Sequence, residues 1–562
     1  GKLTVNRSFF NINEYENNGI RIDGGSGKNH DIQGSTFTIS SEVNPSDATT
    51  TKKTALLITG STDGNIGYYG RTYNNGTGYN TNTYDIVGNN AKKIAAIYMD
   101  SNSSTALEVG GVFKINSGGS SDYNVGVYAE HTSNSNQSAK TINGNYTING
   151  GSYNTGTYLD EAKATNVYGN YNLASGTYQR GVSLKNSKVD DLRGTYTINS
   201  TSSDGVYVDK DSELVKVYNS SFDVKTNNSN GIYSETDKNM DIDATTFYVR
   251  NAGTNTGLTI HNAKTAAATK DTRVVKITNS TFRVDGGPVS NPNNSGIYIR
   301  RIGTLDVDTS TAGETLFEVK NGGTGIAIDT YGYINDEPTL KFNTNPDQVT
   351  GLGANKIVSM QVGYDGSAKN VGINIQKGSL HNVNKKVIIK RGTQDYGLDI
   401  LIGKTGVDGN NIGYNNLNYV PDLTIINGND KNSTQLPGYG TIVVEGNKNI
   451  VFSNLGVIGT ANVDLRNIGI NGSGNTVAFF SNTSAPHIEG GNPSNYGAIG
   501  WVNGGDLKFR AAITGGDFNA VGNDGRTSGN NGRGSGTKWN LAVTGKNWQI
   551  QGKEPELICN LQ

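Results

Sequence analysis

Tyrosine is the side chain whose placement in this sequence most suggests recognition chemistry. A stretch at residues 62–92 sets tyrosines and one arginine among glycines and asparagines, the residue mixture that is typical of binding loops. A tyrosine offers a large contact area with few rotors and a hydroxyl, and an arginine stacks on rings or pairs with anions. We therefore take as candidate ligand-binding residues Tyr68, Tyr69, Arg71, Tyr73 and Tyr79. The alternative, which the composition favours, is a non-specific surface loop.

A second group of tyrosines recurs at a fixed place in a repeated four-residue motif. The motif is a small residue, usually Gly, then an aliphatic, any residue and another aliphatic, as in Gly126-Val127-Tyr128-Ala129. Because side chains alternate along a strand, the two aliphatics face one way and the third residue the other. The outward candidates for ligand binding are Tyr128, Tyr158 and Tyr207. Packing of stacked rings along the surface is the favoured interpretation, and a stripe that contacts sugar rings or a protein is the alternative.

The acidic and histidine residues give little support to catalysis. Asp190, Asp191 and Arg193 lie close together, as do Asp241 and Asp243, but single pairs arise by chance. Polysaccharide lyases and hydrolases need clustered carboxylates, or carboxylates that hold Ca²⁺. The five histidines are isolated, and we expect solvated turn residues at His30, His131, His261, His381 and His487. We therefore expect no enzyme activity, no catalytic residue, no metal and no cofactor.

The repeated motif also predicts the elements that position these side chains. Its spacing is close to 25 residues in the copies at Gly126, Gly156, Gly181, Gly205, Gly231 and Gly257. Further copies are expected at Gly372 and Gly397, and weaker ones near Gly440, Gly469 and Gly497. A second motif centres on an inward Phe or Tyr and predicts a stacked aromatic column inside the fold. Its copies include Tyr146, Tyr171, Tyr196, Phe222, Phe247 and Phe282.

Three short alternating strands in about 25 residues match one coil of a parallel β-helix. The predicted fold class is all-β, a right-handed parallel β-helix with several loop excursions. We expect the solenoid over residues 1–500, and coils or a capping region of the same solenoid over 501–562. The expected excursions are 61–92, 261–274, 329–369 and 402–437, and removal of 63–90 is expected to leave the coils folded.

Composition excludes several classes of protein. The chain has 562 residues with a formal net charge of −1, so it lacks the basic surface that nucleic acid requires. Its one cysteine excludes a disulfide scaffold. No run of about 18 apolar residues is present, so we expect no membrane span in this sequence. Glycine is abundant at 76 residues, which favours turns over helices.

A long β-helix that is rich in Gly, Asn and Thr, close to neutral and nearly free of cysteine resembles the passenger domain of an autotransporter. The resemblance covers about residues 1–500, and it is to the large type Va adhesins of Gram-negative bacteria, of the fusobacterial kind. It implies a virulence-associated protein on the bacterial cell surface, anchored in the outer membrane through a C-terminal translocator that is missing here, or secreted. Because the chain begins at Gly1, we expect a fragment whose targeting segment has been removed.

Three functions remain open at this stage. The first is a monomeric adhesin whose stalk presents loops to host-cell glycans, host protein receptors or partner bacteria. The second is a polysaccharide lyase or hydrolase, or a tailspike-like enzyme of a phage. The third is a structural spacer whose binding tip lies elsewhere.

Overall fold

The computed structural model describes most of the chain up to residue 480 and short stretches after it. The described residues are 1–12, 18–40, 54–67, 81–88, 94–100, 106–117, 123–131, 137–251, 253–286, 294–309, 313–330, 333, 335–343, 358–364, 369–376, 386–391, 397–417, 420–427, 440–454, 458–480, 507–514, 518–521, 538–544, 549–551 and 557–561. Within them the chain is all-β, without a helix, and its strands pair in parallel. The predicted parallel β-helix is confirmed.

The chain forms two compact units. Unit 1 holds 1–241, 245–247 and 255–259, and unit 2 holds 242–244, 248–254 and 260–562. The strands of unit 1 are β1 (Thr4–Asn6), β2 (Phe9–Ile12), β3 (Asn18–Gln33), β4 (Thr36–Ser40), β5 (Thr54–Ile66), β6 (Thr83–Gly88), β7 (Ala95–Asp100), β8 (Leu107–Ser117), β9 (Val125–Glu130), β10 (Gln137–Ser152), β11 (Thr155–Asp160), β12 (Lys163–Thr177), β13 (Arg180–Lys185), β14 (Lys188–Ile198), β15 (Asp204–Val208), β16 (Glu213–Tyr218), β17 (Ser221–Val224) and β18 (Asn230–Ser234).

The residues of β19 (Met240–Asp243), β20 (Thr246–Val249) and β21 (Thr256–Ile260) are divided between the units. The strands of unit 2 are β22 (Val274–Thr278), β23 (Thr281–Asp285), β24 (Ser295–Ile299), β25 (Thr304–Asp308), β26 (Thr315–Lys320), β27 (Thr324–Asp329), β28 (Thr339–Phe342), β29 (Val358–Val362), β30 (Val371–Gln376), β31 (Lys386–Arg391), β32 (Asp399–Asp408), β33 (Ile412–Asn416), β34 (Val420–Asn427), β35 (Ile442–Asn447), β36 (Ile450–Asn454), β37 (Ile458–Asn471), β38 (Asn475–Phe480), β39 (Leu507–Thr514), β40 (Phe518–Val521), β41 (Lys538–Thr544), β42 (Gln549–Gln551) and β43 (Leu557–Leu561).

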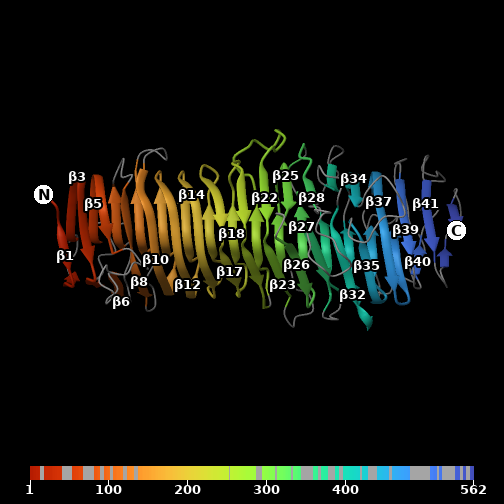
Figure 1. The fold of residues 1–562 in the computed structure, drawn as a ribbon, viewed down its shortest axis with the longest axis horizontal. Helices are drawn as coiled ribbons and strands as arrows, with labels where there is room; N and C mark the ends of the chain where they lie inside the picture. The colour runs from red at the N-terminus through yellow and green to blue at the C-terminus, as the bar shows by residue number, and fades with distance from the viewer. Residues whose placement is uncertain are drawn as a thin grey trace. The chain divides into compact units, whose positions relative to one another are not determined.

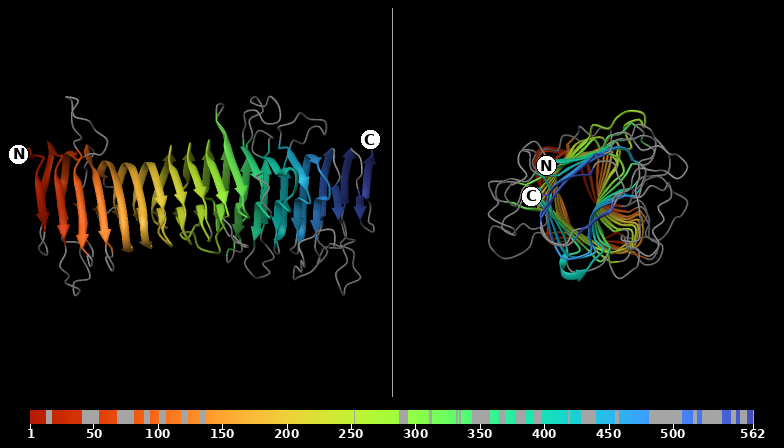
Figure 2. Two further views of the ribbon diagram at one scale, coloured as in Figure 1. Left: turned by 90° about the horizontal axis from the view of Figure 1, so that it is seen from below. Right: turned by 90° about the vertical axis from the view of Figure 1, so that its right-hand side faces the viewer.

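Each predicted motif forms one column of in-register parallel strands, which Figures 1 and 2 show within each unit. The first motif gives the column β7, β9, β11, β13, β15 and β18 in unit 1, where Val127 pairs with Thr157 and Thr157 with Val182. The two other predicted strands of a coil run together as one bent strand in β8, β10, β12 and β14. The bend needs glycine, because a Cβ on Gly169 would stand 2.4 Å from the carbonyl oxygen of Gly144.

The predicted aromatic column is confirmed in unit 1. Its rings run from Phe10 through Phe37, Tyr84, Phe113, Tyr146, Tyr171, Tyr196 and Phe222 to Phe247. Neighbouring ring centroids lie 4.5–5.1 Å apart with nearly parallel planes. Phe282, in unit 2, is also fully buried and stacks on Phe317 at 5.0 Å. The small first residue of the other motif makes room for this column, because a Cβ on Gly156 would stand 2.8 Å from Tyr171.

The hydroxyls of the buried tyrosines differ in how they are satisfied. Thr157 lies 3.0 Å from the hydroxyl oxygens of both Tyr146 and Tyr171 through its Oγ1. The hydroxyl of Tyr196 has no partner among the described residues, and the residue in register with Thr157 on the next strand is Val182. Two of these three buried tyrosine hydroxyls therefore have a partner.

A line of buried polar side chains connects the turns that precede the first-motif strands. In each coil the backbone N–H donates to the side-chain oxygen at the same position of the next coil, at 2.8–3.2 Å. The line runs through Asn124, Asn154, Gln179, Ser203, Ser229 and Asn255. These bonds satisfy turn N–H groups that would otherwise be buried without an acceptor.

Several sequence-based expectations are wrong. The excursions expected at 329–369 and 402–437 contain strands of the coils, β28 and β29 in the first range and β33 and β34 in the second. Tyr84 was placed in the excursion at 61–92, but it is fully buried within the aromatic column, on β6. Removal of 63–90 would therefore delete a core strand, and of the tyrosine-rich stretch 68–80 and 89–92 lie outside the described residues. Gly397 was assigned to the first motif, but β32 pairs with β29 and so continues the second-motif column. The first-motif column continues instead through β33 and β36.

The assignments near Gly440 and Gly469 are wrong for the same reason, since β35 and β37 follow β32 in the second-motif column. The position held by Phe317 becomes Met360, Ile400 and Ile442 along that column. Once the aromatic ring is lost, both motifs are alternating aliphatics after a glycine, and the pattern alone does not separate them. The domain boundary at residue 500 stays a prediction.

Candidate functional site

The structure places three of the eight predicted ligand-binding residues. Tyr68, Tyr69, Arg71, Tyr73 and Tyr79 lie outside the described residues. Tyr128, Tyr158 and Tyr207 point outward from β9, β11 and β15 and are half-buried. Tyr128 and Tyr158 stack at 5.0 Å, and Tyr207 stacks on Tyr233 at 5.9 Å. We call Tyr128, Tyr158 and Tyr207 the inner row, because they are less exposed than a second row described below.

Carboxylates at the ends of strands or just after them accept from the hydroxyls of the inner row. Asp160 accepts from Tyr158 at 3.4 Å and from Tyr128 at 3.5 Å, and it forms an ion pair with Lys185 at 3.0 Å. Glu235 accepts from Tyr207 at 2.8 Å. Burial first, and then the nearby carboxylates, raise the pKa of all three tyrosines well above the usual value, so the hydroxyls stay protonated. The carboxylate with the largest effect is Glu130 for Tyr128, Asp160 for Tyr158 and Glu235 for Tyr207.

Arginine closes the one gap in the inner row. Ser183 stands in register between Tyr158 and Tyr207 and has no ring to stack. The guanidinium of Arg180 takes the place of that ring, 3.6 Å from the centre of Tyr207, and donates to the hydroxyl of Ser183 at 3.3 Å. A cation over an aromatic face is attractive, so the row continues through a charged member.

A second row of tyrosines lies beside the first and was missed by the sequence analysis. Tyr123, Tyr153 and Tyr178 occupy the same turn position in three successive coils and stack at 5.0 and 4.9 Å with nearly parallel planes. Their side chains are 50%, 45% and 50% exposed, whereas large hydrophobic side chains are otherwise mostly buried in unit 1. We call these three residues the outer row. It ends at Ser202, which takes the equivalent turn position in the next coil.

The backbone of the outer row is strained. Tyr123, Tyr153 and Tyr178 have φ of 60°, 59° and 53°, in the left-handed region that bulky residues avoid. The turn position holds Ser202 and then Asn228 in the following coils, with φ of 51° and 58°. Asparagine fits this conformation far better than tyrosine, and such strain costs about 1–3 kcal/mol per residue and concentrates at functional sites. Three tyrosines at this position therefore point to a role for the rings themselves.

The two rows form the walls of a groove of about 330 Å³ on unit 1. Tyr128 and Tyr158 line one side, and the outer row lines the other. Val125 and Thr155 lie between them, and at the third coil Arg180 takes the register position that follows Thr155. The groove therefore crosses three coils and has its one cation near one end.

The charge of Arg180 is balanced beside the groove. Its Nε lies 3.7 Å from Asp204 Oδ2, and the two side chains are 37% and 14% exposed. Asp204 also accepts from Asn230 at 2.9 Å. Burial raises the pKa of Asp204 to about 6, against the opposite effect of Arg180, so this carboxylate is ionised at neutral pH. Among the described residues that line the groove, Arg180 is the one charged side chain.

A sequence signal for the outer row does exist. Each of its tyrosines is followed directly by Asn or Gln. The glycine of the first motif comes two residues after that amide, as in Tyr153-Asn154-Thr155-Gly156. The first motif begins at the glycine, so these tyrosines lie three residues before its first position. The pattern Tyr-(Asn/Gln)-x-Gly would have found all three members.

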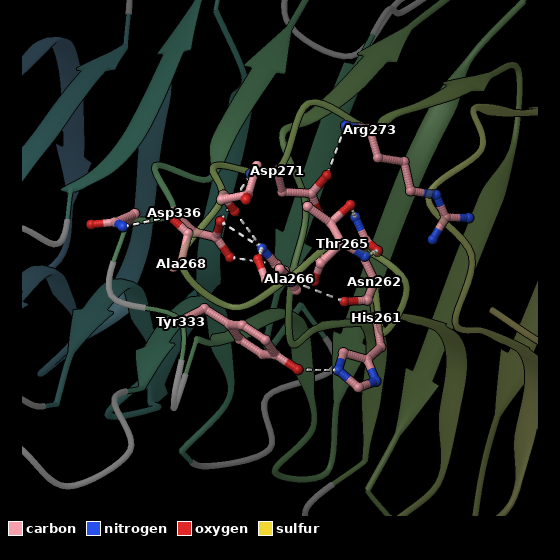
Figure 3. Close-up of polar contacts among 12 residues, drawn as sticks. His261, Asn262, Thr265, Ala266, Ala268, Asp271, Arg273, Tyr333 and Asp336 are labelled. Carbon is pink, nitrogen blue, oxygen red and sulfur yellow. Dashed lines mark hydrogen bonds and ion pairs between the residues drawn. The ribbon is translucent and has the colours of Figure 1, made fainter.

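A second polar cluster lies in unit 2 and is structural. Arg301 is fully buried and forms an ion pair with Asp336 at 2.8 Å. Its guanidinium also donates to backbone carbonyls of 262–269 and lies 4.4 Å from the ring centre of Tyr333. Figure 3 shows the hydroxyl of Tyr333 directed at His261, with 2.6 Å between Oη and Nε2. The cluster therefore holds the expected excursion at 261–274 against Tyr333 and Asp336.

The expectation of solvated histidines is wrong for the two that are buried. His30 accepts from the backbone N–H of Leu3 at 3.1 Å and is 5% exposed, and His261 is 9% exposed. His131 is packed near Asp100, and His381 and His487 lie outside the described residues. No group of three or more His, Cys, Asp or Glu able to hold a metal occurs in the described part of the chain.

Three of the four acidic residues singled out in the sequence have structural partners, and the third of them, Asp243, accepts from Asn279 at 3.2 Å. Asp191 accepts from Arg193 at 2.9 Å and from Tyr168 at 3.1 Å, and Asp190 pairs with Lys163. The described residues contain no helix with the length and hydropathy needed to traverse a bilayer. Comparison of the chain with family models, with curated proteins and with solved structures found no match.

Proposed function

We propose that this chain is the stalk of a bacterial surface adhesin and that it binds its partner through the tyrosine groove of unit 1. The proposal combines the resemblance to autotransporter passenger domains with one structural observation. That observation is a row of half-exposed, stacked tyrosines in strained turns, set along a second row. The partner is a host-cell glycan, a host receptor or another bacterium, and the protein is displayed on the cell surface or secreted.

The parallel β-helix supports this role physically. The described coils that carry the groove are hydrogen-bonded to one another along their strands and through the polar line of the turns. Side chains repeated on successive coils are therefore held in fixed register, and a ligand meets rows that are already ordered. A binding surface built this way loses little side-chain entropy when it is occupied.

Two other functions are weaker proposals. A lyase or hydrolase would need paired carboxylates in a groove, and the residues that line this one are tyrosines, Val, Thr, Ser and one Arg. A pure spacer would need no exposed rings, and asparagine would serve its turns with less strain.

Adhesion of intact cells tests the proposal. Purified chain is immobilised, and the retention of epithelial cells and of oral and gut bacteria is counted under flow. Tyr153→Asn removes the central ring of the outer row and puts in a residue suited to the turn, so the fold is expected to remain. Tyr364→Asn is the matched control, because Tyr364 is 54% exposed and lies in unit 2. Loss of retention with Tyr153→Asn alone supports the proposal, and equal retention by both variants and the parent overturns it.

A further inference from the structure

We infer that the groove binds an uncharged, extended oligosaccharide along its length. The inference rests on the proposed function for the location of the site and goes beyond it by assigning the chemical class of the ligand. Three features of the groove support it: the atoms on its walls, its straight course and its balanced charge.

The walls present ring edges and hydroxyls. Between stacked neighbours the ring faces are covered, so the edges and phenol oxygens remain for a ligand. Thr155 and Ser183 add two more hydroxyls, and Val125 is the one aliphatic side chain in the lining. The hydroxyls of the outer row can donate and accept, whereas those of Tyr128 and Tyr158 donate to Asp160 and offer a ligand their acceptor capacity. A wall of such hydroxyls matches a ligand dense in hydroxyls. It offers no deep apolar pocket of the kind that anchors a protein side chain.

The ring of Tyr178 presents an open face at its end of the outer row. Beyond Tyr178 the turn position is held by Ser202, so the face of Tyr178 that points away from Tyr153 is not covered by a further ring of the row. An aromatic face carries partial negative charge and attracts the polarised C–H groups on the flat side of a sugar ring. One unit of the chain can therefore stack at this end while the others lie along the ring edges.

The groove is straight because its lining residues repeat in register. Val125, Thr155 and Arg180 are aligned on successive parallel strands, as are Tyr128, Tyr158 and Ser183. Two steps of about 4.8 Å between strands make the lined part about 10 Å long. That length suits a short, unbranched segment of an extended polysaccharide better than a compact branched terminus.

The charge argues for a neutral ligand. Arg180 is stacked on Tyr207, bonded to Ser183 and balanced by Asp204, and Asp160 is balanced by Lys185. An acidic sugar would have to compete with Asp204 for Arg180, and a basic sugar would meet no free carboxylate in the lining. Replacing Asp204 with Asn would release the positive charge of Arg180 while keeping the shape of the side chain.

Isothermal titration with defined tetrasaccharides tests the inference. The probes are cellotetraose and chitotetraose as neutral chains, tetragalacturonate as the acidic chain, and the tetramer of glucosamine as the basic one. We expect the neutral chains to bind the parent, with at least about a tenfold loss of affinity in Tyr153→Asn and no change in Tyr364→Asn. Tyr153→Phe keeps the ring and removes the hydroxyl, and it is expected to lose less than Tyr153→Asn.

The outcomes separate this inference from the proposed function. If Asp204→Asn raises the affinity for tetragalacturonate and leaves that for the neutral chains within about twofold, the charge argument stands. If the acidic or basic chain binds the parent as tightly as the neutral ones, or if no tetrasaccharide binds, the inference is overturned. Should cell retention still depend on Tyr153 in that case, the adhesin proposal survives with a protein partner. Neutral chains that bind through Tyr153 without any effect on cell retention would support the inference and overturn the adhesin.

Discussion

Thr157 gives the sharpest test of how the core of unit 1 is built. It is fully buried, and its Oγ1 lies 3.0 Å from the hydroxyls of Tyr146 and Tyr171, which are also buried. Thr157→Val keeps the shape and removes that partner, so at least one tyrosine hydroxyl is left in the core without its bond. An unsatisfied buried hydroxyl costs about 1–3 kcal/mol, and we expect a loss of local stability in that range.

The same change should be nearly harmless when the tyrosines are absent. In a Tyr146→Phe, Tyr171→Phe background no hydroxyl needs the threonine, and we expect Thr157→Val to alter stability by less than about 0.5 kcal/mol. For Tyr196 we expect a change in stability of the opposite sign, because its hydroxyl already lacks a partner among the described residues. Tyr196→Phe should stabilise the coil by about 1 kcal/mol or more.

Native-state hydrogen exchange followed by mass spectrometry is the suitable assay, because a repeat protein opens coil by coil and global unfolding is not a two-state process. Opening free energies are compared for peptides of β10, β12 and β14, with peptides of unit 2 as the internal control. If Thr157→Val lowers the opening free energy equally in both backgrounds, Thr157 does not stabilise the coil through its hydrogen bonds to the tyrosine hydroxyls. A destabilising Tyr196→Phe would show that the Tyr196 hydroxyl has a partner after all.

Three further changes test other parts of the structure. Gly156→Ala puts a methyl 2.7 Å from the carbonyl oxygen of Gly181, and we expect a loss of about 1–3 kcal/mol in the opening free energy of β11, with Ser175→Ala unchanged. Asp204 has a pKa of about 6 in the folded state and near 3.8 in the unfolded state, so the folded state binds the proton more tightly. Stability should therefore fall by up to about 3 kcal/mol as pH rises from 4 to 6. Asp204→Asn should remove that slope from the exchange-corrected protection of β15, and a slope that persists would assign it to another group. Arg301→Met leaves Asp336 buried without its cation, and a loss of about 3–5 kcal/mol should appear as rapid proteolysis within 261–274; resistance equal to the parent would contradict the role given to Arg301.

The fold could be predicted because the β-helix repeats one pattern many times. Alternation places Tyr146 and Phe222 inside and Tyr128 and Tyr158 outside, and the structure agrees at each. Tyr84 was missed because the residues before it, like a loop, are rich in Gly, Asn and Tyr. Burial of its ring depends on pairing of β6 with β4 and β8, and nothing local to the sequence reports that pairing.

The candidate site was only half predictable. The inner row follows from strand parity, whereas Tyr153 and its neighbours lie in turns, where alternation carries no information about direction. Their exposure follows from a left-handed backbone conformation. The sequence does not predict that conformation, because tyrosine rarely adopts it. The balance of Arg180 by Asp204 joins residues one coil apart, and it becomes visible only when the register is known.

The polar line through Asn124, Asn154 and Gln179 has a direction, and that direction bears on how such a chain can change its length. Each coil donates a backbone N–H to the coil that follows and accepts, through its side chain, from the coil before. Every junction along this line is therefore chemically the same, whichever of Asn, Gln or Ser supplies the oxygen. A duplicated coil can accept from the backbone N–H of the coil before it and donate to the side-chain oxygen of the coil after it. When a coil is deleted, its two neighbours can form the same hydrogen bond with each other. Recombination that adds or removes whole coils therefore preserves the hydrogen bonds between neighbouring coils. A break within a coil would instead leave a buried group unsatisfied on each side of the break.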